Sequence, residues 1–458
     1  MKIVSLLFLV SVAAAGCGNH DGGNGNGSGM PDAAPDAPTC EGIGCKQVVC
    51  PGTGTTSISG TVYAPNGTLP IYNATVYVPL RDVGPITTGA TCDRCAQLSG
   101  NPLVRTTTDE QGRFTLTNVP ATSDVPVVIQ VGKWRRKITI PAVPACTDTV
   151  VDTGMTRLPK NKTEGDIPRM ALTTGSSDAL ECMLRKIGLE DSEFTAAGGT
   201  GRVHLYQGAP GTAGAGTGRF DAARGGAAFA PATDLWNTEA ALSAYDVVFL
   251  SCEGETNRAT AKSAQAVAAM KAYVDKGGRM FASHWHSHWI VNNPAPWDNA
   301  ITFFFAGHAA GETTLPDLGD LDADVDTTFP KSAALAQWLV NVGASTVRGK
   351  IPLVDAQHSA IGLNPAYAER WIHVPAEGAR RASVQYASLL TPLEKPTEEK
   401  CGRVVFSDIH VSSGDVSTNS LAFPSGGCTR PVTQLSPQEK VLAFMIFDIA
   451  SCVGDPIE

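Results

Sequence analysis

The sequence has few aromatic residues and few charged ones. Only 7% of its 458 residues are aromatic and 17% are charged, whereas 43% are hydrophobic. Basic residues are scarcer than acidic ones, with 35 Lys and Arg against 44 Asp and Glu, and the formal net charge is −9. A nucleic-acid-binding protein neutralises phosphates with a basic surface, so this balance excludes a nucleic-acid partner. The N-terminal apolar run, residues 3–10, is also far shorter than the about 20 residues of a membrane-spanning helix.

Glycine and proline are abundant instead. The 47 glycines and 30 prolines favour a loop-rich β or α/β protein over a mainly helical one. The hydrophobic fraction is that of a globular protein, and the length corresponds to two or three domains. Composition thus indicates a folded multidomain chain, and its function has to be sought in local motifs.

The first residues bear on the compartment. Residues 1–16 have the order of a secretory signal, since Lys2 is followed by a short apolar run and then by small residues. Cys17, directly after the small residues 14–16, resembles the bacterial lipoprotein box. The resemblance implies that Cys17 is lipidated and attaches the chain to a membrane through a lipid anchor. Gly18 stands where an Asp often marks inner-membrane retention, so the same resemblance implies the outer membrane or cell surface. The alternative is an ordinary signal peptide with an incidental cysteine.

The cysteines also indicate export. Residues 17–56 are rich in Gly, Pro and Asp and are expected to be a flexible tether with a cysteine cluster. Removing Cys17 from the 12 cysteines leaves 11, most of which should form disulfides in an exported chain. The odd number leaves at least one thiol free or bonded to another molecule. Cys92 and Cys95 have a redox-like spacing, but they stand in a predicted loop outside any βαβ unit, so we predict a structural role.

Residues 57–155 have the pattern of a small β domain. Stretches with alternating side chains, separated by Asn-Gly and Gly turns, occur at residues 58–64, 74–78, 113–116, 127–131 and 137–140. Such stretches predict an antiparallel β-sandwich. The basic residues 133–137 are predicted to form a solvated hairpin, because so few charges make a poor polyanion site on an acidic chain.

Part of this β domain resembles a known module. The segments 59–62, 74–78 and 108–114 resemble the carboxypeptidase regulatory-like domain, a transthyretin-type β-sandwich. The resemblance implies a non-catalytic unit that spaces or presents another domain. It brings no peptidase zinc ligands to this chain.

Residues 165–455 alternate between strand and helix patterns. Strands are predicted at 169–175, 202–206, 246–250, 279–283 and 402–407, and the continuous run at 246–250 is typical of a buried parallel strand. Helices are predicted near 179–186, near 259–276 and after a capping box at Ser436. This order predicts a C-terminal doubly wound parallel sheet with an insertion at residues 290–400. Ligands of such sheets bind at the carboxyl ends of the strands.

The predicted strand ends carry the chemistry of this domain. Three of the 9 histidines fall within five positions of one strand end. If the strand continued, these three side chains would point to one side, as in a His-x-His metal site. Side chains from other strand ends could then complete a Zn or Fe site. The predicted metal ligands are His284, His286 and His288, and the possible additions are Glu253, Asp408 and His410.

Two other interpretations of this histidine-rich edge stay open. His284, with Glu253 and His410, could perform acid–base catalysis on a small or sugar substrate that Ser176 and Asp408 help to bind. Alternatively, the neighbouring tryptophans fill the edge of the core, the imidazoles hydrogen-bond backbone groups, and the edge is purely structural.

A second resemblance covers this domain. Three segments resemble the class I glutamine amidotransferase-like superfamily and most closely its trehalose-utilisation (ThuA-like) branch: residues 245–250, 277–284 and 402–410. The resemblance implies a flavodoxin-like fold with functional histidines at the positions of His284 and His410. True amidotransferases place a nucleophilic Cys where His284 stands, so glutamine hydrolysis is not expected. Cys252 ends a different strand and is predicted to be structural.

Two classes of function follow. The first is a cell-surface lipoprotein of the cell envelope, a non-catalytic binding or scaffold protein with a degenerate amidotransferase-like domain. The second is an exported metal- or His-dependent hydrolase that acts on carbohydrate or cell-envelope substrates. The missing nucleophile favours the first, and the histidine cluster favours the second.

Overall fold

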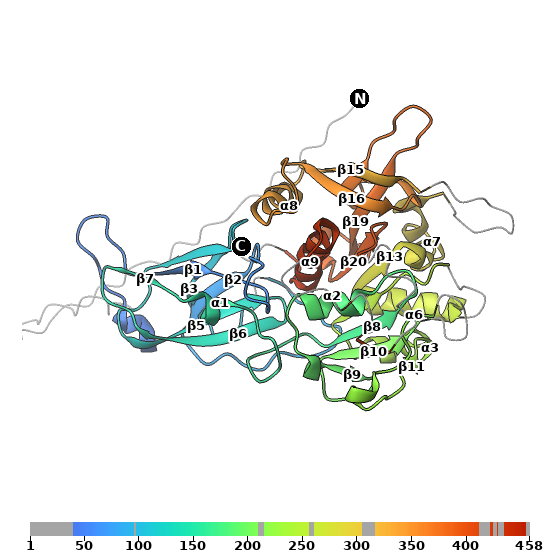
Figure 1. Cartoon of the computed structure of the whole chain (residues 1–458). Helices are drawn as coiled ribbons and strands as arrows, with labels where there is room; N and C mark the ends of the chain where they lie inside the picture. The colour runs from blue at the N-terminus through green and yellow to red at the C-terminus, as the bar shows by residue number, and fades with distance from the viewer. Residues whose placement is uncertain are drawn as a thin grey trace, which may run out of the picture. The chain divides into compact units, whose positions relative to one another are not determined.

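The computed structural model describes residues 40–95, 98–208, 215–255, 261–304, 317–411, 422–424, 428 and 435–454. The expected signal peptide 1–16, the lipidation site Cys17 and most of the expected tether lie outside these residues. Glu41–Glu458 forms one compact unit (Figure 1). None of the helices in the described part of the chain is both long and apolar enough to cross a bilayer.

The first lobe is a β-sandwich of two sheets. The three-stranded sheet has the order β4 (Arg113–Thr117), β1 (Ser57–Thr61) and β7 (Asp148–Val150). The four-stranded sheet has the order β3 (Pro102–Thr107), β2 (Thr75–Pro79), β5 (Ser123–Val131) and β6 (Trp134–Ala142). Side chains alternate between core and solvent along β4, as a strand with one buried face requires. The predicted sandwich is confirmed, although the alternation did not reveal β3 or β7, and β7 pairs with β1 in parallel.

The segment before the sandwich is fixed to it. A short 3-10 helix, η1 (Gly42–Lys46), is followed by a disulfide between Cys50 and Cys146. Lys46 also accepts a backbone hydrogen bond of 2.8 Å from Ala121. The described part of the expected flexible tether, residues 40–56, is therefore attached to the sandwich. A one-turn helix, α1 (Thr153–Thr156), leads out of the sandwich.

The second lobe is built on a parallel sheet. Its central strands lie in the order β10 (Val203–Gln207), β8 (Met170–Thr174), β12 (Val247–Leu250), β13 (Arg279–Ser283) and β20 (Gly402–Ser407). Numbered along the chain, this is the 2-1-3-4-5 order of flavodoxin-like folds. Every residue of β8, β12, β13 and β20 is buried, as strands covered on both faces require. The predicted α/β fold is confirmed.

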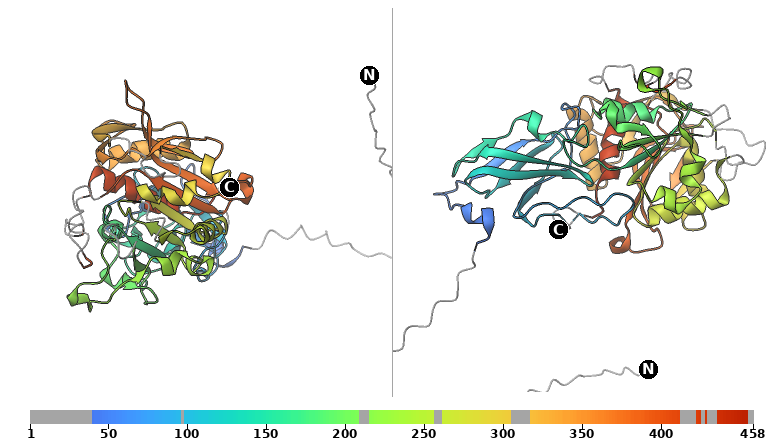
Figure 2. Two further views of the ribbon diagram at one scale, coloured as in Figure 1. Left: turned by 90° about the vertical axis from the view of Figure 1, so that its right-hand side faces the viewer. Right: turned by 90° about the horizontal axis from the view of Figure 1, so that it is seen from below.

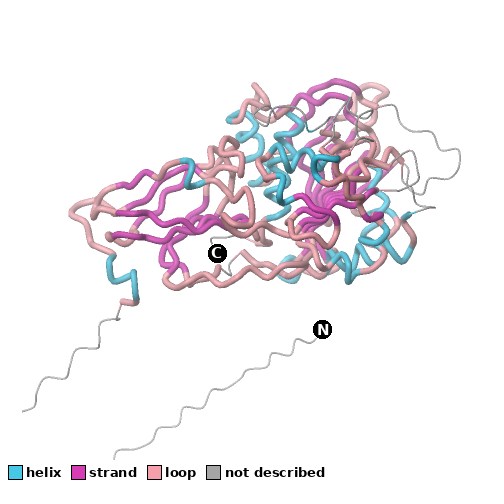
Figure 3. Tube along the Cα trace, turned by 60° about the horizontal axis from the view of Figure 1, so that its bottom comes forward, coloured by secondary structure: helices cyan, strands magenta, loops and turns pink. Residues whose placement is uncertain are grey.

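Helices cover both faces of this sheet (Figures 2 and 3). On one face α2 (Leu180–Lys186) and α9 (Pro437–Ala450) share a core with Phe249, Phe281 and Val405. On the other face α3 (Thr233–Trp236), α4 (Glu239–Leu242) and α6 (Ala264–Asp275) pack with the alternate residues Val248, Met280 and Val404. The capping box predicted at Ser436 begins α9.

The insertion at residues 290–400 widens the sheet. Its strands β19 (Ser383–Thr391), β18 (Glu369–Val374), β15 (Gly319–Val325) and β16 (Lys350–Ala356) continue from β20 in antiparallel pairs, so that the sheet has 11 strands. The short β9 (Phe194–Ala196) and β11 (Ala230–Pro231) both pair with β10 at the opposite edge. Helix α8 (Pro330–Asn341) joins β15 to β16, while β14 (Ile301–Phe303) and β17 (Ala360–Leu363) form a separate ribbon.

The turn between β5 and β6 joins the two lobes. The predicted solvated hairpin is wrong here, because Lys133 and Arg135 are buried and pair with Asp246 and Asp166. Next to them the ring of Trp134 packs against α9, with its centroid 5.8 Å from that of Phe447. These contacts explain why a basic stretch can be buried in an acidic protein.

Two disulfides fasten the lobes together. Cys92 is bonded to Cys401 and Cys95 to Cys452, so the two cysteines bond distant partners and not each other. Their predicted structural role is confirmed. A further disulfide, Cys182–Cys428, holds α2.

Candidate functional site

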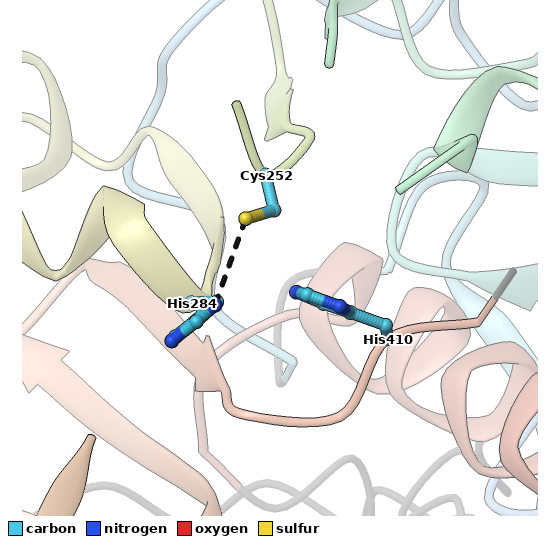
Figure 4. Close-up of side chains that lie close together, drawn as sticks. All are labelled: Cys252, His284 and His410. Carbon is cyan, nitrogen blue, oxygen red and sulfur yellow. Dashed lines mark hydrogen bonds between the residues drawn. The ribbon is translucent and has the colours of Figure 1, made fainter. Parts of the chain in front are cut away.

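Three neighbouring strand ends bring a thiol and two imidazoles together. Cys252 follows β12, His284 directly follows β13, and His410 follows β20. Their ligand atoms all lie within 4.8 Å of one another. The Cys252 Sγ is 3.7 Å from His284 Nδ1, and the two imidazole centroids are 5.2 Å apart. Figure 4 shows the three side chains pointing toward one another, and we refer to them as the Cys-His-His centre.

The backbone at His284 aims its ring into this centre. Its φ is +40°, in the left-handed region that costs a residue with a Cβ about 1–2 kcal/mol. The chain turns there from β13 straight into the 3-10 helix η4 (His284–Ser287) and then into α7 (His288–Val291). Strain of this kind at a strand end is typical of functional sites.

This turn separates the histidines that the spacing had grouped. The strand does not continue, so His286 and His288 do not face the side of His284. His286 Nε2 bonds the Ser251 carbonyl at 2.9 Å, and its Nδ1 accepts a 2.9 Å hydrogen bond from Trp289 Nε1. His288 Nδ1 lies 3.1 Å from the amide nitrogen of Asn292. The predicted metal set His284–His286–His288 is therefore not formed.

Glu253 belongs to a different buried network. Its carboxylate is 2.8 Å from the Lys262 ammonium and 3.9 Å from His286 Nε2, and all three side chains are buried. The predicted pairing of Glu253 with His284 does not occur, because successive residues after β12 point to opposite sides. The residue that meets His284 is its neighbour, Cys252.

Of the two predicted binding residues, Asp408 contacts the insertion. Asp408 accepts hydrogen bonds from the backbone N–H groups of Ser359 and Ala360, each at 2.9 Å, and thereby fixes the insertion to β20. Ser176 stands in the turn after β8, beside Gly254. The carboxylate oxygens of Asp408 are thus occupied by hydrogen bonds to the insertion.

Cys252 is the odd cysteine. All cysteines after Cys17 fall in the described part of the chain, and every one except Cys252 is disulfide-bonded. Cys252 is fully buried, and the backbone N–H of Gly254 donates to its Sγ at 3.4 Å. The sequence interpretation did not place Cys252 beside His284 and His410. Two signals could have found it, namely the odd count and the adjacency of β12 and β13 in a flavodoxin-like strand order.

Burial keeps all three groups uncharged. It raises the pKa of the Cys252 thiol to about 12 and lowers the pKa of His410 to about 4. Burial, with the nearby His410, also holds the pKa of His284 well below its usual range. The imidazole nitrogens therefore keep free lone pairs at neutral pH. His410 Nε2 is buried with no hydrogen-bond partner among the described residues, which costs about 1–3 kcal/mol unless a ligand satisfies it.

A transition-metal ion fits this centre. One thiolate and two imidazoles are ligands that Zn²⁺ prefers, and a set of three leaves the open fourth position seen in catalytic zinc sites. A cation would ionise the buried thiol and give His410 Nε2 the partner that it lacks. Within the described ranges, no other cluster of three such side chains is close enough to share an ion.

Comparisons with known proteins add little beyond the fold. No protein-family model and no curated protein matches the sequence. One solved structure that is similar is a ThuA-like protein from Bacteroides uniformis, at a TM-score of 0.32 and 9% identity over 63% of this chain and 95% of that one. The major pilin subunit BcpA of Bacillus cereus matches at 0.15 and 13% identity, over 23% of this chain and 30% of its own.

A cohesin–X-dockerin complex from Acetivibrio cellulolyticus is also similar. It has a TM-score of 0.15 and 15% identity over 32% of this chain and 78% of that one. With scores this low, the fold class rests on the strand order of the sheets. None of these proteins indicates an activity for this chain.

Proposed function

We propose that the chain is an exported, lipid-anchored protein of the cell envelope whose α/β lobe is a metal-dependent hydrolase. The observation that carries this proposal is the convergence of Cys252, His284 and His410 from three adjacent strand ends. A zinc ion with three protein ligands supplies a bound water whose pKa is near 7, and so a nucleophile at neutral pH. Iron is the second metal that this ligand set suits.

The protein's cysteines and N-terminus support export. Disulfides hold both lobes, and such bonds persist outside the reducing cytosol. The lipoprotein-like sequence around Cys17 supports an anchor in the outer membrane or at the cell surface. An enzyme held there meets carbohydrate and cell-wall material, which we propose as its substrates. The β-sandwich, by its resemblance to carboxypeptidase regulatory-like domains, would present the α/β lobe.

A metal-free cysteine hydrolase fits the centre less well. His284 does lie within reach of the Cys252 thiol as a base. Burial, however, raises the pKa of that thiol to about 12 and lowers the pKa of the imidazole, so the pair stays neutral. His284 also holds the strand-end position at which amidotransferases place their nucleophile. We therefore do not propose glutamine amidotransferase activity.

The second candidate is a non-catalytic binding or scaffold lipoprotein. The observation in its favour is the burial of the centre, since Cys252 is fully covered and His284 is 6% exposed. A closed metal site would stabilise the fold without turning over a substrate. The ThuA-like domain would then be degenerate.

Metal analysis of the full chain, extracted in detergent, tests the proposal. We expect one zinc or iron ion per chain and hydrolysis of at least one member of a panel of esters, glycosides and cell-wall fragments. Cys252→Ala, His284→Ala and His410→Ala should each lose the metal and the hydrolysis. His373→Ala, in strand β18, is the matched control and should retain both.

Each other outcome has a clear meaning. Metal without hydrolysis would favour the scaffold candidate, and folded wild-type protein that takes up no metal would refute the proposal. Cys17→Ser should abolish incorporation of labelled fatty acid, and continued labelling would contradict the anchor.

A further inference from the structure

A buried carboxylate connects the two histidines of the centre. Asp178 lies between β8 and α2 and is 0% exposed. Its Oδ2 accepts a 2.8 Å hydrogen bond from the Ser283 hydroxyl, and its Oδ1 accepts a 3.1 Å hydrogen bond from the Val411 backbone N–H. Ser283 directly precedes His284, and Val411 directly follows His410. One side chain thus holds both segments that carry the imidazoles.

The strand order makes this arrangement unusual. Asp178 follows β8, and β12 lies between β8 and β13 in the sheet. The carboxylate therefore reaches past the strand that carries Cys252 and contacts the two strand ends beyond it. Neither the helix start at α2 nor the end of β8 requires such a contact. Its two hydrogen bonds hold the segments that carry His284 and His410 of the Cys-His-His centre.

We propose that Asp178 is the positioning residue of the Cys-His-His centre: it holds His284 and His410 in place and supplies the negative charge that balances a bound cation. This inference rests on the proposed metal function. A divalent ion, one thiolate and two neutral imidazoles carry a net charge of +1, which one carboxylate neutralises. Buried charges are tolerated where they are paired and hydrogen-bonded in this way.

The other buried acids nearby are less suited to this role. Glu253 already pairs with Lys262 at 2.8 Å. Glu181, in the first turn of α2, has no partner for either carboxylate oxygen among the described residues, and burial raises its pKa to about 8. No described hydrogen bond joins Glu181 to either histidine segment. Burial also raises the pKa of Asp178, to about 7, against its hydrogen bonds from Ser283 and Val411, and a cation bound nearby would lower it.

The test is the affinity of the full chain for Co²⁺ and Zn²⁺ in the variant Asp178→Asn. An amide keeps the size of the side chain and its oxygen can still accept from Val411, so the fold should persist, but the charge is gone. Partners of metal ligands typically contribute about 10–100-fold to metal affinity, and we expect a loss in that range. The thiolate-to-cobalt absorption band should also shift, which a merely structural contact would not cause.

Two further variants make the test decisive. Ser283→Ala removes one hydrogen bond and leaves the charge, so it should give a smaller loss. It also serves as the test if Asp178→Asn does not fold. Glu181→Gln changes an equally buried acid that touches neither histidine segment, and it should bind metal as the wild type does.

The possible failures are distinguishable. If wild-type protein binds metal and Asp178→Asn, or Ser283→Ala in its place, binds with the same affinity and cobalt spectrum, this inference is overturned and the metal function stands. If the wild-type protein binds neither Co²⁺ nor Zn²⁺, the proposed function fails and this inference fails with it.

Discussion

The Lys133 ammonium lies 2.6 Å from the Asp246 carboxylate, and this ion pair crosses from the β-sandwich to the first residue before β12. The two side chains are 9% and 5% exposed. Lys133 also donates to the Gly89 carbonyl and the Thr91 hydroxyl, both at 2.7 Å. Protein groups therefore accept hydrogen bonds from the buried ammonium in place of water. Strand β12, which leads to Cys252, begins at this contact between the lobes.

Lys133→Met should destabilise the protein strongly. The change leaves Asp246 buried without its counter-charge, and breaking one side of a buried pair typically costs about 3–5 kcal/mol. The measurement is the free energy of unfolding by urea at neutral pH. Lys137→Met is the control, because Lys137 pairs with Asp82 at the surface and such pairs contribute little. Equal stability of the two variants would show that the interface does not depend on this pair.

The thiol of Cys252 should be unreactive until the protein unfolds. Without reductant, a thiol-specific reagent should detect no thiol in the native chain and one per chain in guanidinium, because Cys252 is fully buried and the other cysteines of the described part are disulfide-bonded. A count of two in denaturant would indicate that Cys17 carries no lipid. Rapid labelling of the native protein would contradict the buried position, and Cys252→Ala provides the blank.

The stability contributed at Glu181 should fall as the pH rises. Burial raises the pKa of this carboxyl to about 8, whereas an exposed Glu titrates near 4.3. Between these values the folded state holds a proton that the unfolded state releases, so unfolding becomes more favourable with increasing pH. Glu181→Met removes this dependence. We expect the free energy of unfolding of Glu181→Met, minus that of the wild type, to increase by a few kcal/mol from pH 5 to pH 8. Urea unfolding at both pH values measures this difference.

A Glu181→Met variant with the same pH profile as wild type would contradict this assignment.

The pH dependence of stability should have the opposite sign at His410, whose pKa burial lowers to about 4. As the pH falls below the ordinary histidine pKa of about 6.5, His410 is protonated in the unfolded state before it is protonated in the folded state. Acid therefore favours unfolding of the metal-free protein at this residue. His410→Gln should therefore lose less stability than wild type between pH 6.5 and pH 4.

The disulfides between the lobes should be essential for stability. Replacing both Cys95 and Cys452 by Ser should lower the free energy of unfolding by about 2–5 kcal/mol, the range typical of a native disulfide. Peptide mapping without reduction should recover the pairs Cys92–Cys401 and Cys95–Cys452. A recovered Cys92–Cys95 bond would instead identify a redox pair.

The fold could be predicted largely because burial leaves its mark on local sequence. Runs such as residues 247–250 lack polar positions since helices cover both faces, and the sandwich strands alternate since one face is solvated. Strand β3 escaped because all of its residues are half-buried, which gives no alternation. The antiparallel strands of the insertion depend on pairing with β20, a tertiary relationship that local pattern does not contain.

The candidate site could be predicted only in part. The sequence indicated His284 and His410 at the carboxyl edge of the sheet, where the structure brings them together. It could not reveal the left-handed backbone of His284, which decides that His286 and His288 turn away. Cys252 lies beside His284 because β12 and β13 are neighbours in the sheet. Asp178 contacts Ser283 because the turn after β8 passes β12. Local sequence contains neither of these tertiary relationships.

The bonds from Cys92 and Cys95 to Cys401 and Cys452 also govern the order of maturation. The two cysteines of the N-terminal lobe can reach these partners only after residues 401 and 452 have been synthesised. Premature joining of Cys92 to Cys95 would have to be reversed by thiol exchange. Both bonds between the lobes require an oxidant, and under reducing conditions neither would form.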